Sequence, residues 1–290
     1  MLRRSVSQTA VLSLTHLRTQ GEIQMQVVSQ YPDGLFCWVD LGSTDVDAAK
    51  AFYCGLFGWT ILDLPTDMGG IYTMFQIDGY NVTAVSALPP EMQAQGIPTA
   101  WTNYIKHDNV DAAVEKITEA GGTIIAPPFD VMTSGRMAIA LDPGGAGFGI
   151  WQPQDHIGAQ LVNIPNTLVW NELQTRAGDT SKAFYKTVFG WESQTDPNGY
   201  VTFTQNGRFH AGMIIMDDSW DPNMPNQWGP YFMVEDVAAT MEKAKTLGGN
   251  VFVPPTPAGD MGLFSVLQDP SGGVFTVIQF SGPVDAPPGY

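Results

Sequence analysis

Basic residues are scarce in this sequence of 290 residues. Thirteen Lys and Arg residues stand against 29 Asp and Glu residues, and the formal net charge is −16. A chain this acidic repels phosphate backbones and anionic lipid surfaces, so we expect neither nucleic acid nor a membrane among its partners. Hydrophobic runs are also short, and none approaches the roughly 20 residues that a membrane-spanning helix needs.

Cysteine is scarce as well. Cys37 and Cys54 are the two cysteines of the chain, which excludes a framework of several disulfides. Each occupies a position where another small apolar residue would fit, and we interpret both as free thiols. Unpaired thiols are typical of a reducing compartment, so the sequence favours a cytoplasmic location.

The sequence contains an internal repeat. Residues 38–59 read WVDLGSTDVDAAKAFYCGLFGW, and residues 170–191, at an offset of 132, read WNELQTRAGDTSKAFYKTVFGW. Each copy predicts a strand, then a short helix whose Ala, Phe and Tyr side chains pack back on it, then a Gly-Trp exit into a second strand. The chain therefore contains a duplication.

A second pair of repeats has an offset of 127. Gly121-Gly122 and Asp142-Pro143 correspond to Gly248-Gly249 and Asp269-Pro270. The paired glycines end a helix, and the Asp-Pro sequences begin tight turns before a last strand. We predict four modules in the order A, B, A, B, each with one strand, one helix and three further strands, at about 35–88, 99–153, 166–216 and 228–280.

These modules predict an α+β protein with two domains of similar construction. The first domain is expected at residues 34–154 and the second at 166–282, because a linker between Pro153 and Pro165 occupies 155–165. Residues 1–33 lack core periodicity and are predicted to be a disordered N-terminal tail. Residues 283–290 are predicted to be a C-terminal tail.

The K-A-F-Y-x-x-x-F-G-W segment, the Gly-Gly helix stop and the D-P-x-G turn together resemble the vicinal oxygen chelate superfamily. This superfamily includes glyoxalases, bleomycin-resistance proteins and extradiol dioxygenases, and the resemblance covers almost all of residues 35–280. It is strongest to two-domain glyoxalase-like proteins. It implies paired βαβββ modules that form an open, cup-shaped sheet around a cleft, where a divalent metal held by His, Glu or Gln binds two vicinal oxygens of a substrate.

The residues at the metal positions of the superfamily do not suit a metal here. The resemblance places these positions at Trp38, Thr102, Gly149, Trp170, Gly229 and Thr276. An indole nitrogen is only a hydrogen-bond donor, and glycine has no side chain. We therefore expect no tightly held metal and no other cofactor. The alternative is a metal site with noncanonical ligands, for example His210 with Asp40 or Glu172.

Two carboxylates are the candidate catalytic groups. The period-two alternation of a strand puts Asp40 on the same face as Trp38, and Glu172 repeats this arrangement beside Trp170. Such a carboxylate can act as a general base or accept a hydrogen bond from a ligand. The alternative is a purely structural ion pair or hydrogen bond.

Further residues are predicted to line the two clefts. Arg136 is included because the second copy has Leu263 at its position, and an unmatched Arg suits an anionic group of a substrate. The alternative for Arg136 is an ion pair with surface acids. The predicted ligand-binding residues are Trp38, Thr102, Tyr104, Trp151, Trp170, Tyr231, Thr276 and Arg136.

The leading functional hypothesis is a glyoxalase-like or bleomycin-resistance-like protein, monomeric or homodimeric, that binds a small organic molecule without a tightly held metal. If it is an enzyme, the expected class is a metal-independent lyase or isomerase. One alternative is a metal-dependent glyoxalase or dioxygenase. Another is a non-catalytic module that binds a protein partner through its acidic loops.

Overall fold

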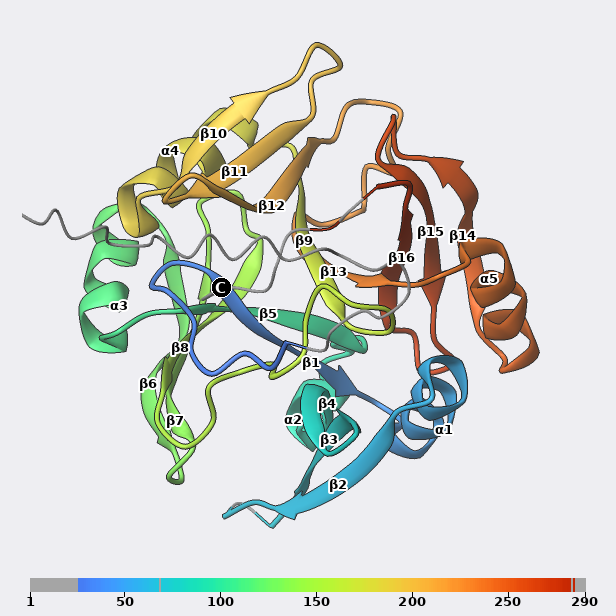
Figure 1. Cartoon of the computed structure of the whole chain (residues 1–290). Helices are drawn as coiled ribbons and strands as arrows, with labels where there is room; N and C mark the ends of the chain where they lie inside the picture. Colours follow the sequence, from blue (N-terminus) through green and yellow to red (C-terminus); the bar gives the residue numbers. More distant parts are fainter. Residues whose placement is uncertain (1–25, 68, 283, 285–290) are drawn as a thin grey trace, which may run out of the picture.

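The computed structural model of the protein describes residues 26–67, 69–282 and 284. In these residues the strands form two sheets of eight strands each, accompanied by a few short helices (Figure 1). The predicted α+β class, with two domains of similar construction, is confirmed. Among the helices described, none is long and apolar enough to cross a membrane.

The first sheet has the strand order β2-β3-β4-β1-β5-β8-β7-β6. β1 runs parallel to β4 and antiparallel to β5, so the first two modules join through β1 and β5. Its strands are β1 (Phe36–Ser43), β2 (Thr60–Pro65), β3 (Ile71–Ile77), β4 (Tyr80–Ala87), β5 (Ala100–Lys106), β6 (Thr123–Val131), β7 (Gly135–Leu141) and β8 (Gly147–Pro153).

The second sheet repeats this topology, with the order β10-β11-β12-β9-β13-β16-β15-β14. β9 and β13 take the places of β1 and β5 at its centre. Its strands are β9 (Leu168–Thr175), β10 (Glu192–Thr195), β11 (Val201–Gln205), β12 (Arg208–Ile215), β13 (Gln227–Met233), β14 (Asn250–Pro257), β15 (Gly262–Gln268) and β16 (Val274–Phe280).

The helices begin and end as their sequences dictate. Asp45 accepts a hydrogen bond from the Ala48 N–H and so caps the first helix, and Gly58 and Gly190 end the two equivalent helices at φ 75°. A side chain other than Gly would be strained in this left-handed conformation. The helices are α1 (Val46–Phe57), α2 (Pro90–Ala94), α3 (Val110–Glu119), α4 (Gly178–Phe189) and α5 (Val237–Thr246).

Each domain completes the hydrophobic core of the other. α1 of the first domain lies beside α5 of the second, and α3 lies beside α4, at opposite sides of the molecule (Figure 1). Tyr53 of α1 packs edge-on against Phe275 of β16, and its hydroxyl donates to Asp269 Oδ2 at 2.8 Å. In the equivalent place, the Tyr185 hydroxyl donates to Asp142 Oδ2 at 3.4 Å. The Tyr of each A-F-Y segment is thus paired with the turn aspartate of the other domain.

The tryptophans of the two Gly-Trp corners are buried, as the repeat predicts. Trp59 is 3% exposed, and its indole N–H donates to the Asn166 carbonyl at 2.9 Å. Trp191 is 1% exposed and donates to the Gly34 carbonyl at 2.7 Å. Because Asn166 and Gly34 precede the first strands of the opposite domains, these bonds also join the two halves.

Residues 26–33 are not a disordered tail, contrary to the prediction. Val28 and Tyr31 are buried, and the Tyr31 hydroxyl donates to the Ala159 carbonyl at 2.8 Å. Two buried side chains in such a short segment leave no periodic signal, which explains the error. Residues 1–25, which make up the rest of the predicted N-terminal tail, and 283 and 285–290 of the C-terminal tail lie outside the described residues.

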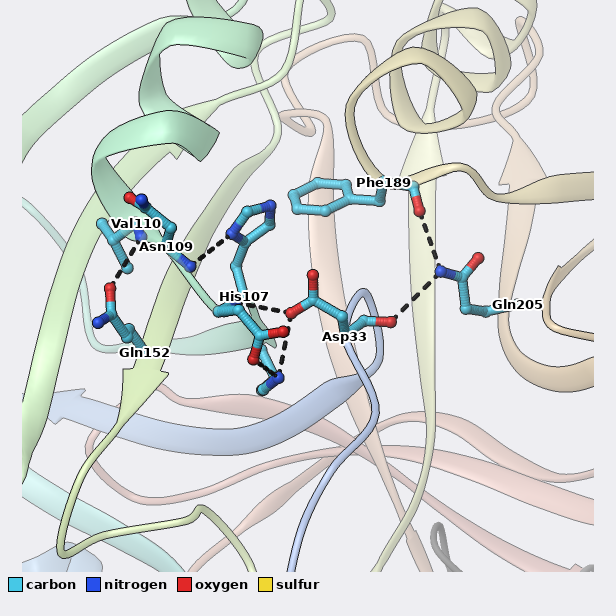
Figure 2. A network of polar contacts seen from close by, with 9 residues as sticks. Asp33, His107, Asn109, Val110, Gln152, Phe189 and Gln205 are labelled. Carbon is cyan, nitrogen blue, oxygen red and sulfur yellow. Dashed lines mark hydrogen bonds and ion pairs between the residues drawn. The ribbon is translucent and has the colours of Figure 1, made fainter.

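Asp33 ties the start of the first domain to both domains (Figure 2). Its carboxylate accepts from the Asp108 N–H at 2.7 Å and from Lys106 Nζ at 3.1 Å. Its carbonyl accepts from the side-chain amide of Gln205, which also donates to the Phe189 carbonyl. The segment before β1 therefore belongs to the domain junction.

Candidate functional site

The first candidate site lies on the face of the first sheet that points away from the second domain. Val39 pairs with Asn103, which donates to Asn171 of the second sheet at 2.6 Å, so this face of the strands meets the other domain. Asp40 has the opposite parity and faces outward. We call this outward side of each sheet its outer face.

The cysteines, Cys37 and Cys54, are both free thiols.

Four side chains of the first outer face form a hydrogen-bonded group, which we call the first carboxylate cluster. The indole N–H of Trp38 donates to the Tyr72 hydroxyl at 2.9 Å, and Tyr72 donates to Asp40 Oδ2 at 2.9 Å. The Tyr104 hydroxyl lies 3.2 Å from both carboxylate oxygens. The predicted residues Trp38, Asp40 and Tyr104 are therefore together, and Tyr72 joins them.

The second sheet contains the same group, the second carboxylate cluster. Trp170 donates to the Tyr200 hydroxyl at 3.0 Å, and Tyr200 donates to Glu172 Oε2 at 3.0 Å. The Tyr231 hydroxyl donates to Glu172 Oε1 at 2.5 Å. Gln174 adds a third donor to the carboxylate at 3.1 Å. An indole, a carboxylate and two phenols thus recur in one arrangement on both outer faces.

Glycines make room for these tyrosine rings. A Cβ at Gly149 would lie 2.1 Å from the ring of Tyr104, and a Cβ at Gly212 would lie 1.8 Å from the Tyr200 hydroxyl. A Cβ at either position would displace the neighbouring tyrosine, so glycine at both positions leaves room for the clusters. Gly149 is also one of the positions where the resemblance places a metal ligand, and the aromatic ring of Tyr104 occupies the space beside it.

Burial makes both carboxylates unusually basic. Loss of solvation raises the pKa of Asp40 to about 6, and the hydrogen bonds from Tyr72 and Tyr104 oppose part of this rise. Burial likewise raises the pKa of Glu172, against the opposing hydrogen bonds from Tyr231, Gln174 and Tyr200. With a pKa of about 6, the carboxyl group of Asp40 can exchange a proton at physiological pH.

Three other predicted residues adjoin the clusters. Thr102 of β5 lies directly opposite Asp40 of β1, and Thr276 of β16 pairs with Tyr231 of β13. Trp151 is buried, and its indole N–H donates to the His156 carbonyl at 2.8 Å. The three side chains thus lie beside the clusters, and their role in ligand binding stays a prediction.

Arg136 does not join the first carboxylate cluster. Its strand partner is Gln152, whose amide oxygen accepts from the Val110 N–H of α3, so this face of β7 is covered by a helix. The guanidinium donates to both carboxylate oxygens of Asp111 at 2.9 Å and to Asp130 at 2.9 Å. Arg136 therefore forms ion pairs with surface acids, which was the alternative interpretation. The prediction that it lines the cleft is wrong.

Sequence reasoning missed Tyr72 and Tyr200. Tyr200 follows Tyr72 by 128 residues, whereas the first strands and helices of the two copies differ by 132. The hairpin before Tyr200 is four residues shorter, so an alignment at constant offset does not pair the two tyrosines. Aligning the hairpins separately would have shown a Tyr in both copies.

Two cavities lie outside the clusters. One, of about 290 Å³, borders the first outer face and is lined by residues 27–29, Asn81, 155–158 and Gln160. The other, of about 320 Å³, lies at the domain junction and includes Asp33, His107, Lys116 and Gln205. Neither was predicted from the sequence.

A match to a protein-family model shows to which superfamily the chain belongs. The model of the Glyoxalase/Bleomycin resistance protein/Dioxygenase superfamily matches residues 36–150 and again residues 164–277. The chain belongs to this superfamily. Its two matches coincide with the two sheets and confirm the resemblance inferred from the repeated motifs.

Two relatives resemble the chain over nearly their whole length. The protein named "Putative glyoxylase CFP32" of Mycobacterium tuberculosis is 42% identical over 256 residues, which cover 87% of this chain and 97% of the relative. The anthracycline biosynthesis protein DauV of Streptomyces sp. is 33% identical over 271 residues, covering 87% and 95%.

Solved structures of other proteins share the fold. The Mn(II)-bound glyoxalase from Novosphingobium aromaticivorans superposes with a TM-score of 0.60 at 17% identity, covering 88% of this chain and 85% of that one. The 2,3-dioxygenase LapB from Pseudomonas sp. KL28 gives 0.62 at 14% identity, covering 89% and 96%. Identities this low establish the architecture alone.

The clusters do not offer the donors that a superfamily metal needs. A divalent metal takes three or more converging nitrogen, oxygen or sulfur ligands, and each cluster has one carboxylate surrounded by hydroxyl donors. Over the part of the chain that the structure describes, no three His, Cys, Asp or Glu side chains come together as such a set. The residues present therefore do not fit the metal.

His210, proposed as a noncanonical ligand, lies elsewhere. Its ring is 4.5 Å from that of Trp191 and 6.2 Å from that of Phe36, both residues of the hydrophobic core. Burial lowers the pKa of His210 to about 3, with a further contribution from Arg208. The structure does not bring His210 together with Asp40 or Glu172.

Proposed function

We propose that this protein binds a small organic molecule, oxygenated or partly aromatic, on the outer face of one or both sheets, without a resident metal. The observation that carries the proposal is the duplicated carboxylate cluster. Glu172 is buried and Asp40 is half-buried, loss of solvation raises the pKa of each carboxyl group, and hydroxyls rather than cations surround them. Titratable side chains whose pKa is shifted by burial are commonly found at functional sites.

The chemistry of the clusters supports a proton acceptor. At pH 7 an Asp40 with a pKa of about 6 is mostly ionised, and it is more basic than an ordinary carboxylate. Tyr72 and Tyr104 orient it by donating their hydroxyl protons. If the protein is an enzyme, we assign it to the metal-independent lyases or isomerases, with Asp40 or Glu172 as the general base.

The surroundings of the clusters support an organic ligand. Indole and phenol rings present apolar surface with a few hydrogen-bonding groups, which is the usual composition of a small-molecule site. The names of the relatives, "Putative glyoxylase CFP32" and "Anthracycline biosynthesis protein DauV", also suit small oxygenated substrates. The unpaired cysteines suit a cytoplasmic location, and the acidic composition argues against nucleic acid as a partner.

The proposal is tested with conservative variants of both carboxylates. Small oxygenated aromatic compounds are screened by their effect on the melting temperature, and those that bind are titrated calorimetrically into Asp40→Asn, Glu172→Gln and the double variant. We expect affinity to fall at least tenfold in one single variant, because the charged hydrogen-bond acceptor is lost. Asp47→Asn, an exposed residue of the first turn of α1, is the control.

Two results would contradict the proposal. Full ligand affinity in folded Asp40→Asn, Glu172→Gln and double variants would make both clusters structural. Ligands that bind only after addition of a divalent metal would instead favour a metal-dependent member of the superfamily.

A further inference from the structure

A polar cavity lies at the junction of the two domains, and we call it the junction cavity. Its wall includes Asp33, His107 and Lys116 from the first domain and residues 187–190 and Gln205 from the second. Its volume of about 320 Å³ is within the range of small-molecule sites, about 300 to 1,000 Å³. No residue of either carboxylate cluster belongs to this wall, so the junction cavity is a separate site.

His107 presents one N–H group to the junction cavity. Its Nδ1 accepts from the Asn109 N–H at 3.0 Å, so the neutral ring carries its proton on Nε2. Burial lowers the pKa of His107, which keeps the ring neutral at pH 7. Among the described residues Nε2 has no hydrogen-bond partner, yet it is not one of the unpartnered atoms that are enclosed. It is therefore accessible, and Figure 2 shows it on the side of the ring turned toward Phe189 of the cavity wall.

Lys116 brings a positive charge to the same place. It is exposed on α3, and its charge lies close enough to His107 to oppose protonation of the imidazole. Within the part of the chain that the structure describes, its ammonium group has neither an ion pair nor a hydrogen bond. An unpaired cation beside a neutral N–H donor is suited to a carboxylate of a ligand.

Other groups of the wall attract positive charge. The Asp33 carboxylate accepts from Lys106 and from the Asp108 N–H through Oδ1, and its Oδ2 has no partner among the described residues. Figure 2 shows this carboxylate between His107 and Gln205. The Gln205 Nε2 donates to two carbonyls, which leaves its amide Oε1 as an acceptor. α4 also ends at this wall, and the carbonyl end of a helix favours a cation.

The equivalent junction on the other side of the molecule lacks these groups. At the repeat offsets of 132, 127 and 128, three polar residues of the wall have apolar counterparts: Pro165 for Asp33, Val234 for His107 and Ile77 for Gln205. Lys116 corresponds to Lys243, but the Lys243 ammonium group donates to the Leu56 carbonyl at 3.0 Å. The polar wall therefore belongs to one junction and is not a by-product of the duplication.

We propose that the junction cavity binds a small α-amino acid in its zwitterionic form. The carboxylate of the ligand pairs with Lys116 and accepts from the His107 Nε2–H, and its ammonium group donates to the free acceptors of Asp33 and Gln205. A simple anion would be repelled by Asp33, and a simple cation by Lys116, so a ligand with both charges complements the wall better than either. Because the wall comes from both domains, the ligand stabilises their junction.

Calorimetric titration of the full chain at pH 7 with each of the common L-amino acids tests the proposal. We expect saturable binding of at least one of them, with one molecule per chain, a shift of the His107 Nε2 resonance and a higher melting temperature. The tightest ligand is then compared with its analogues that lack the ammonium or the carboxylate group. Each analogue should bind at least tenfold more weakly, because hydrogen bonds to one charged group are lost.

Two results of these titrations overturn the inference. The first is that no amino acid binds saturably. The second is that an analogue binds as tightly as the parent amino acid, because the cavity would then hold a simple anion or a simple cation.

Variants of the wall assign the binding to this cavity. Lys116→Met should weaken binding at least tenfold, whereas Lys116→Arg keeps the charge and should lose less. Lys243→Met is the matched control, because Lys243 holds the same repeat position at the other junction, and it should bind like wild type. Wild-type affinity in Lys116→Met refutes the proposed site.

Asp40→Asn separates this inference from the proposed function. Loss of amino-acid binding in Asp40→Asn, with full binding in Lys116→Met, would assign the ligand to the first carboxylate cluster and refute the junction site. Loss in Lys116→Met with full binding in Asp40→Asn supports the junction site, whatever the outcome for the carboxylate clusters.

Discussion

Replacing Asp40 with Asn should make the protein more stable at pH 7. Burial raises the pKa of Asp40 from an ordinary 3.8 to about 6, so the folded state holds this proton more tightly than the unfolded state does. Between about pH 4 and pH 6 the wild-type protein therefore loses stability as pH rises. A shift of about two units, at about 1.4 kcal/mol each, corresponds to about 3 kcal/mol at pH 7.

Urea unfolding at a series of pH values measures this effect. Below about pH 4 the carboxyl group is protonated in both states, so wild type and Asp40→Asn should have similar stabilities. The difference in the free energy of unfolding should grow up to about pH 6 and then level off in favour of the variant. Glu119→Gln, which removes an exposed carboxylate of α3, is the control.

The opposite sign would refute the reasoning. If Asp40→Asn is less stable than wild type at pH 7, the hydrogen bonds from Tyr72 and Tyr104 outweigh the loss of solvation. Asp40 would then stabilise the fold, and its burial would no longer favour a functional role.

Three further predictions concern the clusters, the corners and the metal. Tyr72→Phe should raise the pKa of Asp40 further, because a hydrogen bond that favours the ionised form is lost. A ¹³C NMR titration of the Asp40 carboxyl carbon measures this pKa. An unchanged or lower pKa would contradict the hydrogen bond from Tyr72 to Asp40. Trp59→Ala and Trp191→Ala should each lower the free energy of unfolding by about 3 to 5 kcal/mol, since both indoles are buried, and variants that unfold like wild type would show that these corners carry no core packing. Elemental analysis after gentle purification should find well under one metal per chain, and a full equivalent of zinc, iron, nickel or manganese would disprove the metal-free proposal.

The parts of the fold that the sequence predicted are those with periodic signals. The 132-residue repeat identified the strand and helix around Trp38 and Trp170, and period-two alternation put Asp40 and Glu172 on the outer faces. These features depend on local geometry. They can be read from one segment without knowing its partners.

Other features depend on contacts between distant segments. Tyr72 joins the first carboxylate cluster through the pairing of β3 with β4 and of β4 with β1, and the unequal hairpins hid its relation to Tyr200. Arg136 was expected in the cleft because it has no counterpart, but its strand partner Gln152 places it under α3. His156 lies in a linker, where sequence patterns give no indication of what a side chain will contact.

The packing of α1 and α4 against the opposite domain bears on how the protein evolved and on whether it can be divided. Tyr53 and Tyr185 each find their hydrogen-bond partner in the opposite half, so the two halves are related as the subunits of a symmetric dimer would be. A single ancestral domain could have made the same contacts with a second copy of itself before gene fusion. In the present chain, dividing the protein at the linker would expose the aromatic faces of α1 and α4, and neither fragment would be a self-sufficient domain.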